Sequence, residues 1–138
     1  MIFRIKLLHE KAKVPERMWK SAGYDVFAVE DMLIHPMQTK VVKLGFAAEF
    51  DPEYVAYMWP RSGMSVRGAQ RTAGVIDADY REEWAIVLCN IAIADIVIKP
   101  GDRVGQIVFH RIEHPVIETC TELVMPSERG KGYGSSGK

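Results

Sequence analysis

The sequence predicts an all-β protein, a sandwich or barrel of short strands, and two observations support this. Prolines at positions 15, 36, 52, 60, 100, 115 and 126 divide the chain into short segments, several of them rich in β-branched and aromatic residues. Turn-forming sequences, Asp51-Pro52-Glu53 and Lys99-Pro100-Gly101-Asp102, separate some of these segments. Many short strands at regular spacing are typical of β-sandwiches and barrels.

The elements follow from local residue patterns. The expected strands cover residues 2–7, 41–50, 54–59, 84–89, 91–98 and 104–112. The first of these alternates with period two over most of its length, which is the strand repeat. Residues 62–67 are expected to form one short helical turn with Ser62 as its N-cap. Residues 1–126 form the expected β domain, and the glycine-rich residues 127–138 a flexible C-terminal arm with little to bury.

Bulk properties indicate a soluble protein of one domain. The 138 residues are 48% hydrophobic and 26% charged with a formal net charge of zero, so no general attraction to nucleic acid or membrane is expected. Cys89 and Cys120 lack the spacing of a zinc or redox motif. Arg4 and Lys6 interrupt the N-terminal apolar stretch, and the apolar run 85–98 is too short to span a bilayer. A cytoplasmic location is expected.

The loop Pro60-Arg61-Ser62-Gly63 has the composition of an anion site. Backbone amides at the start of a helical turn, the forked guanidinium of Arg61 and the bare backbone of Gly63 all suit a phosphate group. Taken alone, the same loop is also an ordinary corner between a strand and a turn.

The segment Gly74-Val75-Ile76-Asp77-Ala78-Asp79-Tyr80 carries paired carboxylates and an aromatic ring. In a regular strand Asp77 and Asp79 share one face and Tyr80 points to the other. Such carboxylates can orient a water or a metal, or form a solvated polar face. For Asp77 and Tyr80 to serve one pocket, the strand must turn or bulge between them.

Two further segments complete the candidate set. Arg129, an aromatic ring at Tyr133 and several glycines give the C-terminal run the parts of a flap that covers a nucleotide, although it also reads as a plain tail. Asp102, Arg103 and Gln106 lie at a loop–strand junction, where a structural salt bridge is the simpler role for the charged pair.

Together these segments resemble the trimeric dUTPases, the deoxyuridine triphosphate nucleotidohydrolases. Five motifs occur in the family's order: AGYDVFA at 22–28, PRSGM at 60–64, GVIDADYR at 74–81, GDRVGQI at 101–107 and the tail RGKGYGSSG at 129–137. The resemblance covers essentially the whole chain. It implies a jelly-roll-like distorted barrel and a homotrimer with active sites at the subunit boundaries.

The resemblance also implies the activity. The expected reaction is Mg²⁺-dependent hydrolysis of dUTP to dUMP and pyrophosphate by water attack on the α-phosphorus, which limits dUTP and supplies dUMP for thymidylate synthesis. Asp77 would orient the water, Tyr80 would pack under the deoxyribose and Asp25 would support the metal through its waters. The other substrate-binding residues implied are Arg61, Ser62, Gly63, Gly74, Ile76, Gln106, Arg129, Tyr133, Gly134 and Ser135.

The chain departs from the family pattern at three places, and two alternatives stay open. The hairpin of residues 67–73 is shorter than in many members, and its Arg71 falls near where bacterial relatives often have an asparagine that contacts uracil. Glu82 replaces the usual glycine after Tyr80-Arg81, and the tail is about one glycine shorter than the common pattern. A dCTP deaminase shares this fold, but residues 84–90 offer no carboxylate where that enzyme needs a glutamate. The other alternative is a nucleotide-sensing or partner-binding protein built on the dUTPase scaffold.

Overall fold

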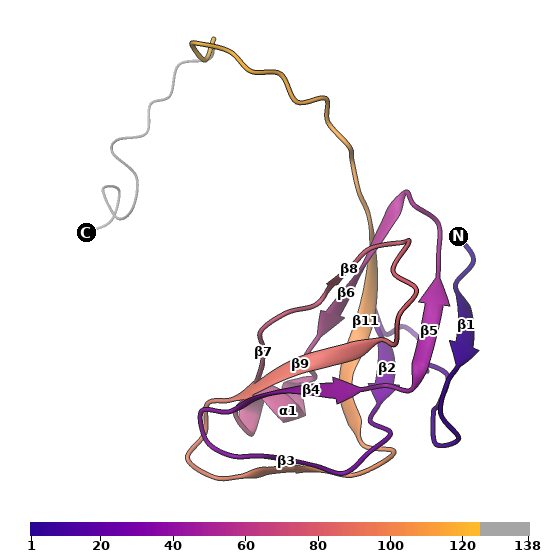
Figure 1. Ribbon diagram of the computed structural model, residues 1–138, viewed down its shortest axis with the longest axis vertical. Helices are drawn as coiled ribbons and strands as arrows, with labels where there is room; N and C mark the ends of the chain where they lie inside the picture. Colours follow the sequence, from indigo (N-terminus) through magenta and orange to yellow (C-terminus); the bar gives the residue numbers. More distant parts are fainter. Residues whose placement is uncertain (125–138) are drawn as a thin grey trace.

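The computed structural model describes residues 1–124, which form antiparallel strands and one short helix (Figure 1). The first strands are β1 (Arg4–Leu7), β2 (Tyr24–Phe27), β3 (Met32–Ile34), β4 (Thr39–Lys43), β5 (Phe46–Glu49) and β6 (Tyr54–Trp59). After the helix α1 (Ser62–Val66) come β7 (Ala69–Arg71), β8 (Val75–Ile76), β9 (Ala85–Asn90), β10 (Ile96–Ile98) and β11 (Arg103–Arg111). No helix among these residues is long and apolar enough to cross a membrane.

The strands of the described part are arranged in two larger sheets and two ribbons. The order in the larger sheets is β2-β11-β6-β8 and β4-β9-β7, while β1 pairs with β5 and β10 with β3. None of these sheets closes on itself. The prediction of an all-β fold is confirmed, and the open sheets fit a distorted, jelly-roll-like architecture.

The hydrophobic core joins the buried faces of the two larger sheets. Strand β9 alternates buried and half-buried positions, and its Ile86 and Leu88 meet Met58 of β6 and Ile107 of β11 in one core cluster. Trp84 is fully buried beside them. Because every second residue of these strands faces the core, the residues between them are free to line the outer surface.

Two strand predictions needed correction. Residues 41–50 divide into β4 and β5 because Gly45 has a φ of 72°, the left-handed conformation that breaks an extended strand. Only residues 96–98 of the predicted strand 91–98 are extended. The loop before β10 is held by the side chain of Asn90. Its amide donates to the carbonyls of Ile34 and Ala94 at 2.9 and 2.8 Å.

The prediction that Ser62 caps α1 was wrong. Arg61 occupies the N-cap position, with an extended backbone and no side-chain hydrogen bond to the helix. Its carbonyl accepts the Ser65 N–H at 3.0 Å, so Ser62 is the first helical residue. The extended Arg61 therefore continues the direction of β6 up to the helix.

Candidate functional site

Three adjacent strands bring the predicted phosphate-binding residues together. In the central strand β11, Gln106 is paired with Asp25 of β2 on one side and with Trp59 of β6 on the other. Arg61 follows Trp59 by two residues and lies at the same end of the sheet. Residues that are distant in sequence thus meet because the strands align at this register.

Asp25 is held by two arginines. Arg61 Nε lies 3.0 Å from its Oδ1, and Arg103 Nη1 lies 3.3 Å from its Oδ2. The Asp25 side chain is only 18% exposed, so both ion pairs are partly shielded from water. The expected salt bridge between Asp102 and Arg103 is not formed, because Arg103 pairs with Asp25. Asp102 instead accepts the Lys99 N–H at 2.8 Å and closes the preceding turn.

These residues surround a hollow of about 230 Å³, here called the phosphate pocket after the role predicted for them from the sequence. Its lining includes Glu16, Asp25, Arg61, Ser62 and Gln106. Gly63 lines a neighbouring hollow of about 300 Å³ that shares Arg61 and also contains Arg67 and Arg103. Glu16 was not among the predicted site residues, and it lines the pocket because its backbone forms a β-bridge with Asp25. No motif in the sequence predicts this bridge.

The other predicted segment begins where Gly74 approaches β6. Gly74 has a φ of 147°, and a Cβ there would lie 2.8 Å from the Cβ of Met58, so only glycine fits. The Met58 N–H donates to the Gly74 carbonyl at 2.8 Å. This contact leads directly into β8, in which Val75 and Ile76 pair with Tyr57 and Ala56.

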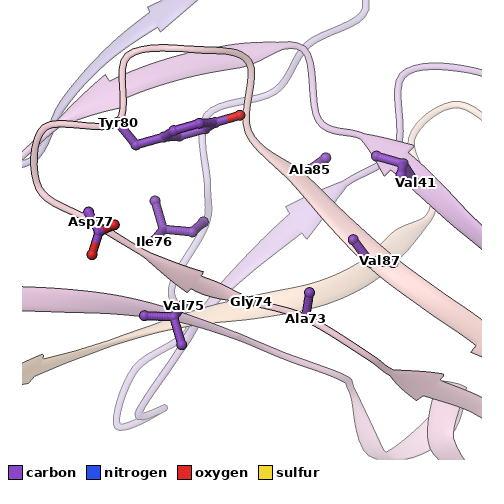
Figure 2. Close-up of a pocket in the computed structure, with 9 residues that line it drawn as sticks. All are labelled: Val41, Ala73, Gly74, Val75, Ile76, Asp77, Tyr80, Ala85 and Val87. Atoms are coloured by element: carbon purple, nitrogen blue, oxygen red, sulfur yellow. The ribbon is translucent and has the colours of Figure 1, made fainter.

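A turn follows β8 and brings Asp77 and Tyr80 to one pocket. The Tyr80 N–H donates to the Asp77 carbonyl at 3.1 Å, and Arg81 Nη1 donates to the Ala78 carbonyl at 2.7 Å. The turn that a shared pocket required is therefore present. Asp77 and Tyr80 line a hollow of about 260 Å³ together with Gly74 and Ile76, here called the nucleoside pocket after the role predicted for these residues from the sequence (Figure 2).

The walls of the nucleoside pocket are mainly apolar. Figure 2 shows the Tyr80 ring above Ile76, with Val41, Ala85 and Val87 at the far side. Val41 of β4 and Val87 of β9 are cross-strand partners. Sequence analysis missed these wall residues. These residues alternate with buried positions along their strands. The alternation predicts that they face away from the core, but it does not predict that they line a pocket.

The two pockets are separated along β6. Ile76 pairs with Ala56 of β6, a strand that ends at Trp59, and Arg61 lies five residues beyond Ala56 with an extended backbone. At roughly 3.3 Å per residue, the segment from Ala56 to Arg61 spans up to about 16 Å, and Asp77 follows Ile76 in the direction that leads away from Arg61. Accordingly, they line different pockets.

Four predicted site residues lie outside the part of the chain that the structure describes. They are Arg129, Tyr133, Gly134 and Ser135. Within residues 1–124, no group of three or more histidine, cysteine, aspartate or glutamate side chains could by itself hold a metal ion. Any divalent ion at this site would need ligands other than such a cluster.

Comparison with known proteins identifies the family. The family model described as dUTPase matches residues 10–137. The deoxyuridine 5'-triphosphate nucleotidohydrolase of Paramecium bursaria Chlorella virus 1 is 36% identical over 135 residues, covering 96% of each chain. A dUTPase of Staphylococcus bacteriophage 80alpha, solved with dUpNHpp, is 29% identical with a TM-score of 0.90, covering 99% of this chain and 98% of its own.

A second phage structure bears on metal binding. The dUTPase of phage phi11 of S. aureus, described with a coordinated structural Mg(II) ion, is 27% identical with a TM-score of 0.84. It covers 91% of this chain and 100% of its own. The sequence motifs, the two pockets and these matches lead to one conclusion: the chain belongs to the dUTPase family.

Proposed function

We propose that this chain hydrolyses dUTP to dUMP and pyrophosphate, and that water attacks the α-phosphorus. The observation that carries the proposal is the turn after β8, which presents a carboxylate and an aromatic ring to one pocket in a member of the dUTPase family. Relatives over nearly the whole chain are named deoxyuridine 5'-triphosphate nucleotidohydrolases.

Asp77 is the proposed general base. Its carboxylate lines the nucleoside pocket and forms no ion pair within residues 1–124. An unpaired carboxylate is available to accept a proton from water as the oxygen bonds to phosphorus, and the bond to the leaving pyrophosphate breaks. Positioned proton acceptance of this kind typically contributes about 10²–10⁴-fold to a rate.

Tyr80 is the proposed platform for the deoxyribose. Its ring faces the pocket above Ile76, where an apolar sugar face can rest on it. A ribose 2′-hydroxyl placed against such a ring loses its hydrogen bonds to water without gaining a partner, which is unfavourable. Gly74 and Ile76 would form the opposite wall and contact the nucleoside.

The phosphate pocket is the proposed site of the triphosphate. Arg61 supplies a forked donor, Ser62 and Gly63 supply backbone amides, and Gln106 adds an amide side chain. Negative charge that develops on the phosphoryl oxygens during attack is stabilised by such preorganised donors. The ion pairs with Asp25 hold Arg61 in place before the substrate arrives.

The phosphate pocket fits Mg²⁺ brought with the nucleotide. Glu16 and Asp25 face the same hollow as Arg61, so its positive charge is largely offset and a triphosphate needs further counter-charge. Both Asp25 oxygens are engaged by arginines, which favours support of the ion through its waters over direct ligation. Mg²⁺ commonly keeps several waters and binds substrate phosphates, and when bound it neutralises phosphate charge.

The C-terminal residues are proposed to complete the site. Arg129 would pair with the γ-phosphate, Tyr133 would stack on the uracil, and Gly134 with Ser135 would let the backbone follow the nucleotide. Residues 127–138 would thus act as a flap on the domain of residues 1–126. A cytoplasmic location, expected from the sequence, stays a prediction.

The active site is proposed to form between subunits of a homotrimer. In one chain Asp77 and Arg61 line different hollows, with up to about 16 Å of strand between Ala56, the partner of Ile76, and Arg61. This separation favours a site in which Asp77 of one chain and Arg61 of another bind the same dUTP. A neighbouring chain can supply the missing half. The apolar residues of the segment 112–124, which leads away from the strands (Figure 1), support a partner because Val116, Ile117, Leu123 and Val124 are almost fully exposed.

The test is a substrate comparison. Purified protein with Mg²⁺ is incubated with dUTP, UTP, dTTP or dCTP, and the products are identified. We expect pyrophosphate and dUMP from dUTP and little product from UTP or dCTP. Deamination of dCTP faster than hydrolysis of dUTP would contradict the proposal. Strand β9 gives no support to the deaminase alternative, since residues 85–90 include no carboxylate.

A further inference from the structure

Arg71 forms an unusual contact between the nucleoside pocket and β6. Its Nη1 donates to the Met58 carbonyl at 2.8 Å, and its guanidinium carbon lies 4.3 Å from the centre of the Trp59 ring. A cation over an indole ring adds attraction to the hydrogen bond. Arg71 is thus held at the end of β7 by two consecutive residues of another strand, and we call this set the Arg71 clasp.

The clasp takes the place of a strand hydrogen bond. The Met58 N–H is paired with the Gly74 carbonyl, but no bond returns from the Gly74 N–H to the Met58 carbonyl. The guanidinium of Arg71 occupies that carbonyl instead. Within residues 1–124 the Gly74 N–H is therefore unpaired, and Gly74 lines the nucleoside pocket.

Few other bonds hold this wall of the pocket. Strand β8 has two residues, and between β7 and β8 the Thr72 N–H donates to the Val87 carbonyl at 3.1 Å. The side chain of Arg71 also lies against Gly74, since its Cδ would be 3.2 Å from a Cβ there. Arg71 thus links the Gly74 wall to β6, beside the backbone hydrogen bond from the Met58 N–H to the Gly74 carbonyl.

We propose that Arg71 is a positioning residue for base selectivity: the clasp fixes the Gly74 wall of the nucleoside pocket without touching the base. This inference rests on the proposed function. The guanidinium is directed to Met58 and Trp59, so it is not a substitute for an amide that reads uracil. Steric rejection of an extra methyl group requires a wall that does not yield, and one methyl in a fitted pocket is worth about 10–200-fold in specificity.

The experiment compares dUTP with dTTP, whose base carries one more methyl group. The values of kcat/KM for both substrates are measured on the same preparation of wild type, Arg71→Met, Trp59→Leu and the double variant. The ratio of the two values is independent of the fraction of folded enzyme, so a loss of stability alone does not change it. Arg111→Met is the matched control, because Arg111 pairs with Glu53 at 2.8 Å on the surface.

In Arg71→Met we expect the preference for dUTP over dTTP to fall about ten-fold. Trp59→Leu should shift the ratio in the same direction by less, and Arg111→Met should leave it unchanged. Because both residues act through one clasp, the double variant should resemble Arg71→Met, whereas independent sites would add. Trp59 is partly exposed, so its variant remains informative if Arg71→Met does not fold.

The opposing results are distinct. An unchanged ratio in active Arg71→Met, or additive losses in the double variant, would overturn the positioning role. Wild-type protein without activity on dUTP would instead overturn the proposed function, on which the ratio depends.

Discussion

The phosphate pocket and the nucleoside pocket each contain an aspartate, but the two carboxylates differ in their ion pairs. In the phosphate pocket the carboxylate of Asp25 is bound by two arginines and serves to orient them. In the nucleoside pocket Asp77 has no such partner within residues 1–124, and its place is set by backbone contacts at Gly74 and Tyr80. In the function proposed here, the paired charges hold the substrate and the unpaired carboxylate of Asp77 accepts the proton.

This difference also separates the two halves in space. Asp77 and Arg61 line different hollows, and in the proposed trimer each chain would contribute these two halves to different active sites. We expect substitutions in the nucleoside half to act mainly on kcat and substitutions in the phosphate half to act mainly on KM. The following changes test that division, beginning with the largest effect.

Asp77→Asn should lose about 10²–10⁴-fold in kcat, because an amide cannot accept the proton of the attacking water. The fold and the binding of a nonhydrolysable dUTP analogue should remain, which calorimetry can measure. Asp79→Asn is the matched control, since Asp79 is not part of the pocket lining. Near-normal turnover in Asp77→Asn would move the general base elsewhere.

Deletion of residues 127–138 should abolish most turnover while the melting temperature stays close to that of the full chain. By sequence this segment has little apolar surface to bury, so ordering it at about 1–2 kcal/mol per residue must be offset by ligand contacts. Removing a water-excluding flap lowers the rate of the chemical step. Full activity after the deletion would refute the roles given to Arg129 and Tyr133.

Mixing two variants that are each nearly inactive at low dUTP concentration should restore activity at that concentration if the halves belong to different chains. Arg61→Ala and Asp77→Asn subunits, dissociated and reassembled in equal amounts, should give about a quarter of wild-type activity, since each half is intact in half of the cases. Arg61→Ala/Asp77→Asn double-variant subunits mixed with Asp77→Asn subunits are the control and should stay inactive. No recovery after exchange verified by mass spectrometry would place both halves in one chain.

Asp25→Asn should raise KM for dUTP about ten-fold and lower the free energy of unfolding by about 1–3 kcal/mol, the range for lost hydrogen bonds to charged groups. Both arginines lose their partner in a site that is mostly shielded. Steady-state kinetics and thermal unfolding measure the two effects. A large fall in kcat with unchanged KM would contradict the division between the halves.

Asp31→Asn, which belongs to neither half, should have the smallest effect. Asp31 pairs with Lys99 at 2.7 Å, and both side chains are exposed, so water screens the pair. The Lys99 hydrogen bond and charge lower the pKa of Asp31. Any contribution to stability is therefore present at neutral pH and lost as pH falls through that lowered pKa. Melting temperatures of both proteins from pH 7 to pH 2 should nearly coincide.

Much of the fold was predictable because it depends on local pattern. Strands near β1, β6, β9 and β11 were predicted from alternation and β-branched residues, and the turns at 51–53 and 99–102 from proline and glycine. The strands β2 and β3 were not predicted. Each is short, and its extended conformation is stabilised by pairing with a distant strand, β11 for β2 and β10 for β3. Gly45 divides a segment whose composition alone favours one strand.

The candidate site divides in the same way. The residues proposed to carry the chemistry could be selected from the sequence, because Asp77, Tyr80, Arg61 and Gly74 stand out by residue type and motif. The contacts of these residues could be seen only in the folded structure. Asp25 pairs with Arg61 and Arg103, and Asp77 and Tyr80 line one pocket. Arg71 contacts Met58 and Trp59. Such contacts depend on strand register, which is set by packing across the whole sheet and not by any residue's neighbours in sequence.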